Sequence, residues 1–237
     1  MEAVPILASD STGSLPLACD MLREPSSSSA AQYENDDKSD TLTQHFLSGE
    51  LVRFHHAALR RKSIPGKGNG LVVSEAVPAG TLLLVGAAFV QGETRRDRLS
   101  KVLAQRKASA MNFQRMMSMA AVEGICSAEC NESLFQQHRD VDRDEILRIM
   151  DILGTNDHGP AFWIEPAGAN HSCDSNARFI TDRKTLELSI KTTRPLEPGE
   201  EVTVSYLNKK MNRTSRRILL KKGWGFDCQC SKCEAEA

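Results

Sequence analysis

Three cysteines near the carboxyl end are the residues whose spacing most directly predicts chemistry. Cys228, Cys230 and Cys233 stand within the segment CQCSKC, in a chain that has seven cysteines in all. This spacing suits metal ligation better than disulfide pairing, because cysteines so close along the chain seldom reach disulfide geometry. Tetrahedral zinc needs a fourth ligand. The remaining cysteines supply the candidates, which are Cys19, Cys126, Cys130 and Cys173.

Cys173 is the fourth zinc ligand that we predict from the sequence. It belongs to residues 170–174, which read NHSCD, and such a dense polar run beside a strand indicates a site rather than core. Cys126 and Cys130 have no matching cluster of Cys or His nearby, so we interpret them as structural. A zinc ion with four thiolate ligands has no open position for water, and its role would be to order the C-terminal tail. The thiols also predict a reducing compartment.

Short strands that follow turns are the elements expected to position these residues. The glycine-rich stretch 64–70 leads into the apolar run LVV, which predicts a loop that feeds a short strand. The turn signals VPAG and LEPG precede two further strand-like runs, at 81–85 and 202–206. Alternation of apolar with polar residues predicts another, half-buried strand, at Leu186, Leu188 and Ile190.

Residues 94–153 are predicted to be mainly helical, because apolar residues recur there with the period of a helix. The residues that show this period are Leu99, Val102, Leu103, Ile146, Ile149, Met150 and Leu153. Gly154 is the expected stop of the last of these helices. Thr214 or Ser215 is expected to cap a later helix that ends at Gly223. Helices and many short strands together indicate the fold class α+β.

Composition limits the kind of protein. The 237 residues, 40% of them hydrophobic, suffice for a sizeable core, and 30 basic against 31 acidic residues give no overall attraction to nucleic acid or anionic membrane. Basic runs such as 60–62 are short and typical of solvated faces, so we do not expect direct nucleic-acid binding. No apolar stretch approaches the roughly 20 residues of a membrane helix, and the first residues carry no leader pattern. We therefore expect an unsecreted protein without a membrane partner.

Four segments, taken in order, resemble the SET-domain protein-lysine methyltransferases. They are KGNG at 67–70, NHSC at 170–173, GEEVTVSY at 199–206 and the C-x-C-x2-C tail. The resemblance covers about residues 62–90 and 156–233. It is nearest to the branch that often carries MYND or tetratricopeptide modules, neither of which is evident in this sequence.

This resemblance implies a domain organisation. A SET domain of several short-stranded sheets would occupy residues 51–210, with a helical insert at about 94–153. A zinc-binding post-SET segment would follow at 211–237. Residues 1–50, which are rich in Ser, Asp and Glu, would form a disordered tail.

The resemblance also implies roles for particular residues. Tyr206 corresponds to the family's catalytic tyrosine and contributes to the cofactor site. Asn170 and His171 correspond to the pair that contacts the cofactor, and Phe226 resembles the aromatic residue that packs on its adenine. The remaining implied cofactor contacts are Lys67, Gly68, Asn69 and Asn156. The implied zinc ligands are Cys173, Cys228, Cys230 and Cys233.

By this resemblance the chain would transfer a methyl group from S-adenosyl-L-methionine to the side-chain amine of lysine in a protein substrate, histone or non-histone. A free lysine amine has a pKa near about 10.4, so the site must favour the neutral amine by desolvation. The expected cofactors are S-adenosyl-L-methionine and structural Zn²⁺, in a monomer of the nucleus or cytoplasm. The alternative is a non-catalytic SET-like scaffold stabilised by zinc, against which the retention of Asn170, His171 and Tyr206 argues.

Overall fold

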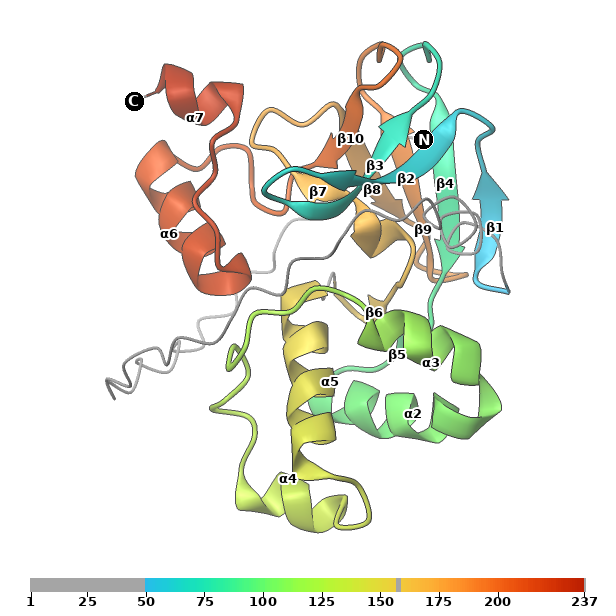
Figure 1. Cartoon of the computed structure of the whole chain (residues 1–237), viewed down its shortest axis with the longest axis vertical. Coiled ribbons are helices and arrows are strands. Elements are labelled where there is room, and N and C mark those ends of the chain that lie inside the picture. The colour runs from blue at the N-terminus through green and yellow to red at the C-terminus, as the bar shows by residue number, and fades with distance from the viewer. Residues whose placement is uncertain (1–49, 157–158, 237) are drawn as a thin grey trace. The chain divides into compact units, whose positions relative to one another are not determined.

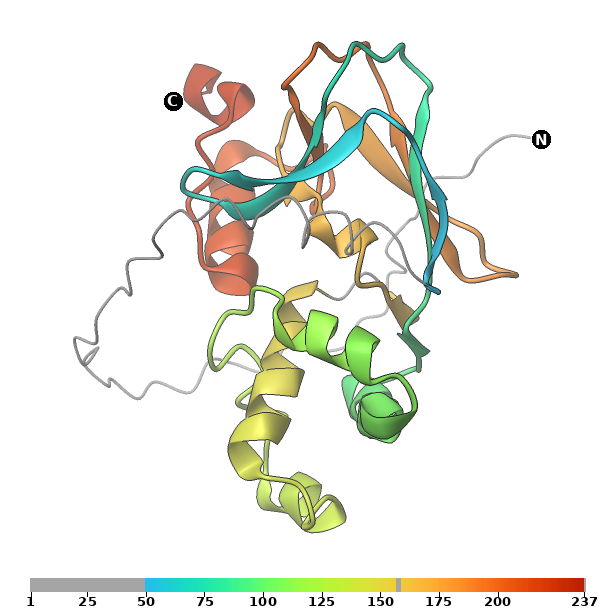
Figure 2. The ribbon, with the colours of Figure 1, turned by 45° about the vertical axis from the view of Figure 1, so that its right-hand side comes forward.

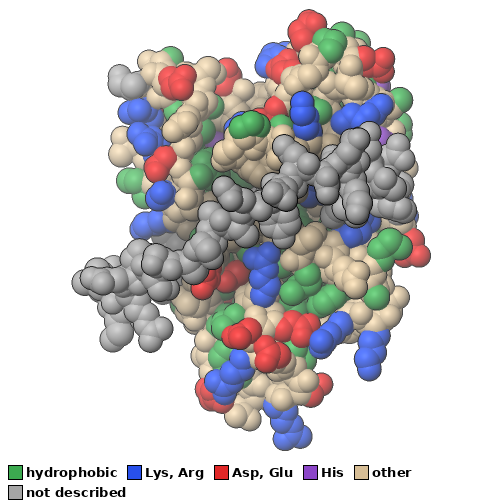
Figure 3. All heavy atoms as spheres, in the orientation of Figure 1, with side chains coloured by type: hydrophobic (Ala, Val, Ile, Leu, Met, Phe, Trp, Pro, Cys, Tyr) green, Lys and Arg blue, Asp and Glu red, His purple; other side chains and the backbone are tan. Residues whose placement is uncertain are grey.

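Residues 50–156 and 159–236 are described in a computed structural model of the protein (Figure 1). The predicted tail therefore lies outside the described residues, apart from Glu50. All described residues fall within the unit Asp37–Ala237. Acidic and basic side chains are interspersed over the face shown in Figure 3, as the balanced composition predicts.

Two four-stranded sheets and a two-stranded pair make up the β structure of the described part of the chain. The first sheet has the strand order β1-β4-β9-β8 and the second has the order β2-β3-β10-β7. Neighbouring strands are antiparallel except β7 and β10, which run parallel. The strands of the first sheet are β1 (Val52–His55), β4 (Leu82–Ala87), β9 (Glu187–Thr192) and β8 (Ala177–Thr181). Those of the second are β2 (Leu59–Ile64), β3 (Gly68–Val73), β10 (Glu201–Val204) and β7 (Asn170–His171), and the pair is β5 (Val90–Gln91) with β6 (Ala161–Phe162).

Strand β9 follows the predicted alternation only in part. Leu188 and Ile190 are buried and the residues beside them are partly exposed, as expected for a half-buried strand. The prediction was wrong for Leu186, which lies before the strand in a turn with a φ of 53°. Its carbonyl accepts a hydrogen bond from Trp163 Nε1 at 2.9 Å, so the fold uses it to satisfy a buried indole.

Apolar side chains from both larger sheets share one hydrophobic core. Leu59 and Leu71 come from the second sheet, and Leu84 and Ile190 come from the first. Ala169, just before β7, is buried in the same core. Packing of Ala169 in this core therefore helps to fix the chain at the start of the NHSC run.

Four helices occupy the predicted helical region and lie to one side of the larger sheets in Figures 1 and 2. They are α2 (Arg95–Ala108), α3 (Ala110–Met117), α4 (Glu132–Gln137) and α5 (Arg143–Asn156). The period read in α5 is confirmed, because Ile146, Ile149, Met150 and Leu153 are all fully buried. None of the helices described in the structure has both the length and the apolar character needed to cross a membrane.

Gly154 does not end α5, contrary to the sequence prediction. The helix continues to Asn156. A Cβ on Gly154 would lie 2.4 Å from Cys126 Sγ and 2.9 Å from Ile125 Cγ2. The glycine therefore allows a loop to pack against the helix, which is a tertiary demand that a helix-stop rule does not consider.

The C-terminal part of the structure contains α6 (Arg213–Trp224) and α7 (Ser231–Ala235). The predicted cap and end of α6 were both wrong. Asn212 is the cap, and its side chain accepts a hydrogen bond from the Ser215 N–H at 2.9 Å. The helix runs through Gly223 and ends at Trp224, and Gly225, with a φ of 74°, is its left-handed C-cap.

Candidate functional site

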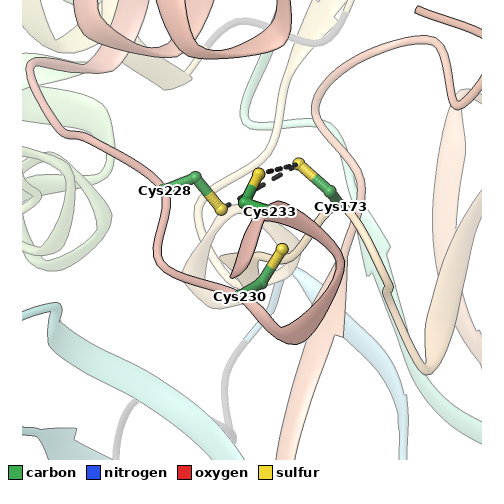
Figure 4. Close-up of side chains that lie close together, drawn as sticks. All are labelled: Cys173, Cys228, Cys230 and Cys233. Carbon is green, nitrogen blue, oxygen red and sulfur yellow. Dashed lines mark hydrogen bonds between the residues drawn. The ribbon is translucent and has the colours of Figure 1, made fainter. Parts of the chain in front are cut away.

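The four predicted zinc ligands converge at one point, although Cys173 is remote from the others in sequence. Cys173 follows β7, Cys228 and Cys230 lie between α6 and α7, and Cys233 lies in α7 (Figure 4). Their sulfur atoms all lie within 4.8 Å of one another. Cys173 Sγ is 3.6 Å from Cys233 Sγ and 3.9 Å from Cys228 Sγ. Four sulfurs around tetrahedral zinc would be about 3.8 Å apart, so the donor set fits this ion.

Burial of these thiols has a consequence for metal binding. Burial raises the pKa of Cys173 and of Cys228 above the ordinary range for cysteine. Without a metal the two thiols therefore hold their protons at neutral pH. Binding of an ion that requires thiolates must release those protons.

His171 connects the cysteine cluster to Tyr206. Its Nδ1 accepts a hydrogen bond from the Tyr206 N–H at 3.0 Å, so we assign the ring proton to Nε2. Nε2 lies 3.3 Å from Cys173 Sγ. Burial, followed by the charges of Arg216 and Lys67, lowers the pKa of His171 to about 4, which keeps the ring neutral. Both ring nitrogens of His171 thus have partners within the protein.

Tyr206 lies two residues beyond the end of strand β10. The sequence predicted a strand through residue 206, but β10 ends at Val204, and the Tyr206 N–H donates to the His171 side chain instead of to a backbone carbonyl. Parallel pairing of Val204 with His171 sets this arrangement. The Tyr206 hydroxyl donates a hydrogen bond to the Ala169 carbonyl at 2.8 Å, and burial raises its pKa, so it stays protonated.

Aromatic rings gather around the tyrosine. The Tyr206 ring centroid is 5.1 Å from that of His171 and 5.1 Å from that of Trp224. The Phe226 centroid is 6.1 Å from that of His171. Tyr206, Trp224 and Phe226 pack against the same cluster that contains the buried cysteines. The C-terminal segment therefore supplies part of the wall around the tyrosine.

The predicted glycine-rich loop is mostly strand. Gly68 begins β3, and the turn of the β2–β3 hairpin is closed by the Lys67 N–H, which donates to the Ile64 carbonyl at 3.0 Å. Gly70 faces Asn170, because a Cβ there would lie 2.7 Å from Asn170 Nδ2. Asn170 Nδ2 in turn donates to the Asn69 carbonyl at 3.2 Å. The structure thus brings together the KGNG and NHSC segments, which are separate motifs in the sequence.

Glu201 completes this polar group and was given no role by the sequence. Its carboxylate lies 2.5 Å from Lys67 Nζ and accepts a hydrogen bond from Asn170 Nδ2 at 2.9 Å. The available signal was an acidic pair at the start of β10, formed by Glu200, just before the strand, and Glu201, its first residue. Of that pair, Glu200 instead accepts from Asn176, at 3.0 Å.

Asn156 lies apart from these contacts, at the end of α5. Its side-chain amide donates to the Ala120 carbonyl at 2.8 Å and to the Ile152 carbonyl at 2.9 Å. Neither bond reaches Asn170 or His171. Its role in cofactor binding stays a prediction.

Arg216 is a second residue that the sequence did not single out. Its side chain is buried from α6 against the sulfur atoms of Cys173 and Cys233. The available signal was its spacing of four residues from Leu220, which places both on the buried face of α6. An arginine on an apolar helix face usually has a buried partner.

Comparison with known families identifies the class of this protein. The family model described as SET domain matches residues 68–207, which is more than half of the chain. The chain therefore belongs to the SET-domain family. The resemblance inferred from four segments and the α+β fold class are confirmed, and the match also includes the helical region between them.

Curated relatives are enzymes or SET-domain proteins of several organisms. Histone-lysine N-methyltransferase SET5 of Meyerozyma guilliermondii is 30% identical over 102 residues, which are 42% of this chain and 21% of that protein. A SET and MYND domain-containing protein of Dictyostelium discoideum is 32% identical over 123 residues, covering 44% of this chain and 34% of that one. Protein-lysine N-trimethyltransferase SMYD5 of Mus musculus is 33% identical over 85 residues, covering 35% and 20%. The matches thus span 20% to 34% of these relatives' own lengths.

Proposed function

We propose that this chain transfers a methyl group from S-adenosyl-L-methionine to the side-chain amine of lysine in a protein substrate. The observation that carries the proposal is the placement of Tyr206. Its protonated hydroxyl is anchored on the Ala169 carbonyl, beside the NHSC run and among aromatic rings. Membership of the SET-domain family supports the reaction class. The relatives named as lysine methyltransferases support a lysine substrate, with histone and non-histone proteins both open.

The polar group around Asn170 suits the amino-acid end of S-adenosyl-L-methionine. The Lys67 ammonium and the Glu201 carboxylate, which pair with each other at 2.5 Å, would supply one charge of each sign for the carboxylate and the ammonium of a zwitterionic ligand. Gly70 leaves space where a side chain would strike Asn170. We assign the charged end to Lys67, Asn69 and Asn170, with Glu201 as an added contact. Gly68, the His171 backbone and Phe226 complete the proposed cofactor site.

The aromatic wall suits the lysine. S-adenosyl-L-methionine supplies an electrophilic methyl group, and the accepting amine must be neutral. Tyr206, Trp224 and Phe226 would exclude water from the lysine side chain and so disfavour its charged form. Tyr206 would hold the amine in line with the methyl group, since alignment is the main contribution an enzyme can make to a direct displacement.

A structural zinc ion would hold this wall in place. We assign its ligands as Cys173, Cys228, Cys230 and Cys233, whose sulfur separations fit tetrahedral coordination. Four thiolates leave no position for substrate, so the ion would act by ordering the segment that carries Phe226. Zinc thiolates also fit the reducing nucleus or cytoplasm, where we place the protein as a monomer.

Calorimetric titration of S-adenosyl-L-methionine into the zinc-loaded protein tests the cofactor site before any substrate is known. We expect saturable binding that Asn170→Ala abolishes, because this variant removes the amide that joins Asn69 to Glu201. Asn131→Ala is the matched control, since Asn131 is exposed and caps a helix of the insert. A folded, zinc-loaded wild-type protein that binds no S-adenosyl-L-methionine would favour the scaffold alternative.

Tyr206→Phe tests the catalytic assignment. Transfer of labelled methyl groups to core histones should fall by about a hundredfold or more, because the hydroxyl aligns the reacting groups. Binding of S-adenosyl-L-methionine should stay at the wild-type level, because the ring and its packing are kept. Equal transfer by the variant and the wild type would exclude Tyr206 from catalysis.

A further inference from the structure

A buried guanidinium lies against the cysteine cluster. Arg216 is 2% exposed, and its Nε lies 3.2 Å from Cys173 Sγ. Its Nη2 lies 3.7 Å from Cys233 Sγ. These two sulfurs are themselves 3.6 Å apart. One edge of the guanidinium therefore faces two neighbouring cysteine sulfurs.

We propose that Arg216 is a positioning residue of the zinc site, which orients two ligands and offsets part of the charge of the metal–thiolate cluster. The inference rests on the structural zinc proposed above and goes beyond its four ligands. Nothing in the family match or in the relatives' names gives this arginine a role.

Charge provides the first reason. Four thiolates and one Zn²⁺ carry a net charge of about −2, and burial of such a charge is costly unless it is paired. Arg216 brings +1 into contact with two of the sulfurs, which leaves a smaller uncompensated charge. Glu236 Oε2 lies 2.7 Å from Arg216 Nη2, but the Glu236 side chain is 40% exposed and is screened by water.

Geometry provides the second reason. The planar fork of arginine can donate to two neighbouring acceptors at once, whereas a lysine ammonium is a point charge. The remaining donors of Arg216 hold the fork in place, because Nη1 donates to the Met211 carbonyl at 2.7 Å and Nη2 contacts Glu236. The guanidinium is thus oriented independently of the cysteines and can orient them.

Cys173 is the ligand most affected by this arrangement. Its sulfur faces Arg216 Nε on one side and His171 Nε2 at 3.3 Å on the other. Two N–H donors to one thiolate fix its direction, in the way that residues behind a metal ligand generally do. Because Cys173 links the first part of the site to the C-terminal segment, its orientation decides whether both parts share the ion.

Zinc affinity, measured by competition with a chromophoric chelator, tests the proposal. We expect Arg216→Gln to weaken zinc binding by about 10- to 100-fold, which is the usual effect of losing a residue that supports a metal ligand. The matched control is Arg217→Gln, the neighbouring arginine on α6, whose side chain is 41% exposed and pairs with Asp227. The control should bind zinc within about twofold of the wild type.

The outcomes separate the two proposals. Wild-type protein that binds no zinc would overturn the metal site itself. Wild-type protein that binds zinc tightly, with Arg216→Gln of equal affinity but lower stability with and without the metal, would show that Arg216 only packs. That result would overturn the inference and leave the zinc site standing.

Arg216→Lys covers the case in which Arg216→Gln does not fold. It keeps the charge but loses the fork, so we expect an intermediate loss of zinc affinity and a shifted thiolate-to-metal absorption band in the Co²⁺-substituted protein. Wild-type affinity together with an unshifted band would refute the orienting role.

Discussion

The helical insert and the C-terminal segment are stabilised by different means. The insert has a core of fully buried aliphatic and sulfur-containing side chains, among them Leu99, Ile149 and Leu153. The cluster that includes residues of α6 and α7 has four buried members, which are Leu220, Cys173, Cys228 and Cys233. Burial of apolar area can hold the first region, whereas the buried core of the second consists of one leucine and three cysteines, with partly buried aromatic side chains around them. The stability of the candidate site therefore depends on the C-terminal segment, whose buried core is made mainly of cysteines.

Removal of zinc should give the largest difference between the two regions. Chelation is expected to abolish the protection of α6 and α7 in hydrogen exchange and leave α2 and α5 protected. A structural zinc site contributes about 10–16 kcal/mol in small zinc-finger peptides, far more than the apolar contacts in this segment. Hydrogen exchange read by mass spectrometry, with and without chelator, makes the measurement. An equal loss of protection in both regions would contradict the view that only the C-terminal segment depends on zinc.

The buried ion pair between Arg115 and Glu165 tests whether the insert also depends on charge. Arg115 in α3 contacts the Glu165 carboxylate, with side chains 8% and 0% exposed. Burial raises the pKa of Glu165, and Glu165→Gln should lower the free energy of unfolding by about 3–5 kcal/mol because it leaves a buried charge poorly paired.

Urea denaturation gives this value. Glu132→Gln is its control, since Glu132 pairs with Arg143 at the surface and should cost at most about 1 kcal/mol. Similar values for the two variants would mean that the buried pair adds nothing special.

Ile149→Ala sharpens the view that the insert is held by its apolar core. Ile149 is 0% exposed and packs in the hydrophobic core of the insert. We expect a loss of about 2–5 kcal/mol, and less than about 1 kcal/mol for the control Leu147→Ala, which is 36% exposed on the same helix. Zinc affinity should not change in either variant. Coupling between Ile149→Ala and zinc affinity would show that the two regions are not independent.

Asp151→Asn gives the smallest expected effect and concerns the loop between α3 and α4, which packs against α5. Asp151 Oδ2 accepts from the Gly124 N–H at 2.9 Å, and Oδ1 accepts from the Cys126 N–H at 3.4 Å. Loss of the charge and of one acceptor should cost about 1.5–3 kcal/mol. Thermal unfolding measures it, and an unchanged midpoint would mean that the packing of Gly154 alone holds the loop.

Local patterns were sufficient for much of the fold. The apolar period of α5 and the turn-then-strand order of β4 follow from short-range rules, and the structure contains both elements. Exact ends were less predictable, as Gly154 and Gly225 show. The end of a helix depends on which glycine is free to adopt a positive φ and which one is needed for packing, and this depends on neighbours distant in sequence.

The sequence by itself determined the class of chemistry, because the cysteine spacing and the NHSC run state which atoms are available. Only the tertiary structure decided how those atoms meet. Parallel pairing of β7 with β10 brings His171 to Tyr206, and the position of α6 brings Arg216 to Cys173. Such contacts join segments dozens of residues apart, and no local period encodes them. In the sequence, Glu201 and Arg216 are ordinary charged residues. Only the fold places Glu201 beside Asn170 and Lys67, and Arg216 beside Cys173.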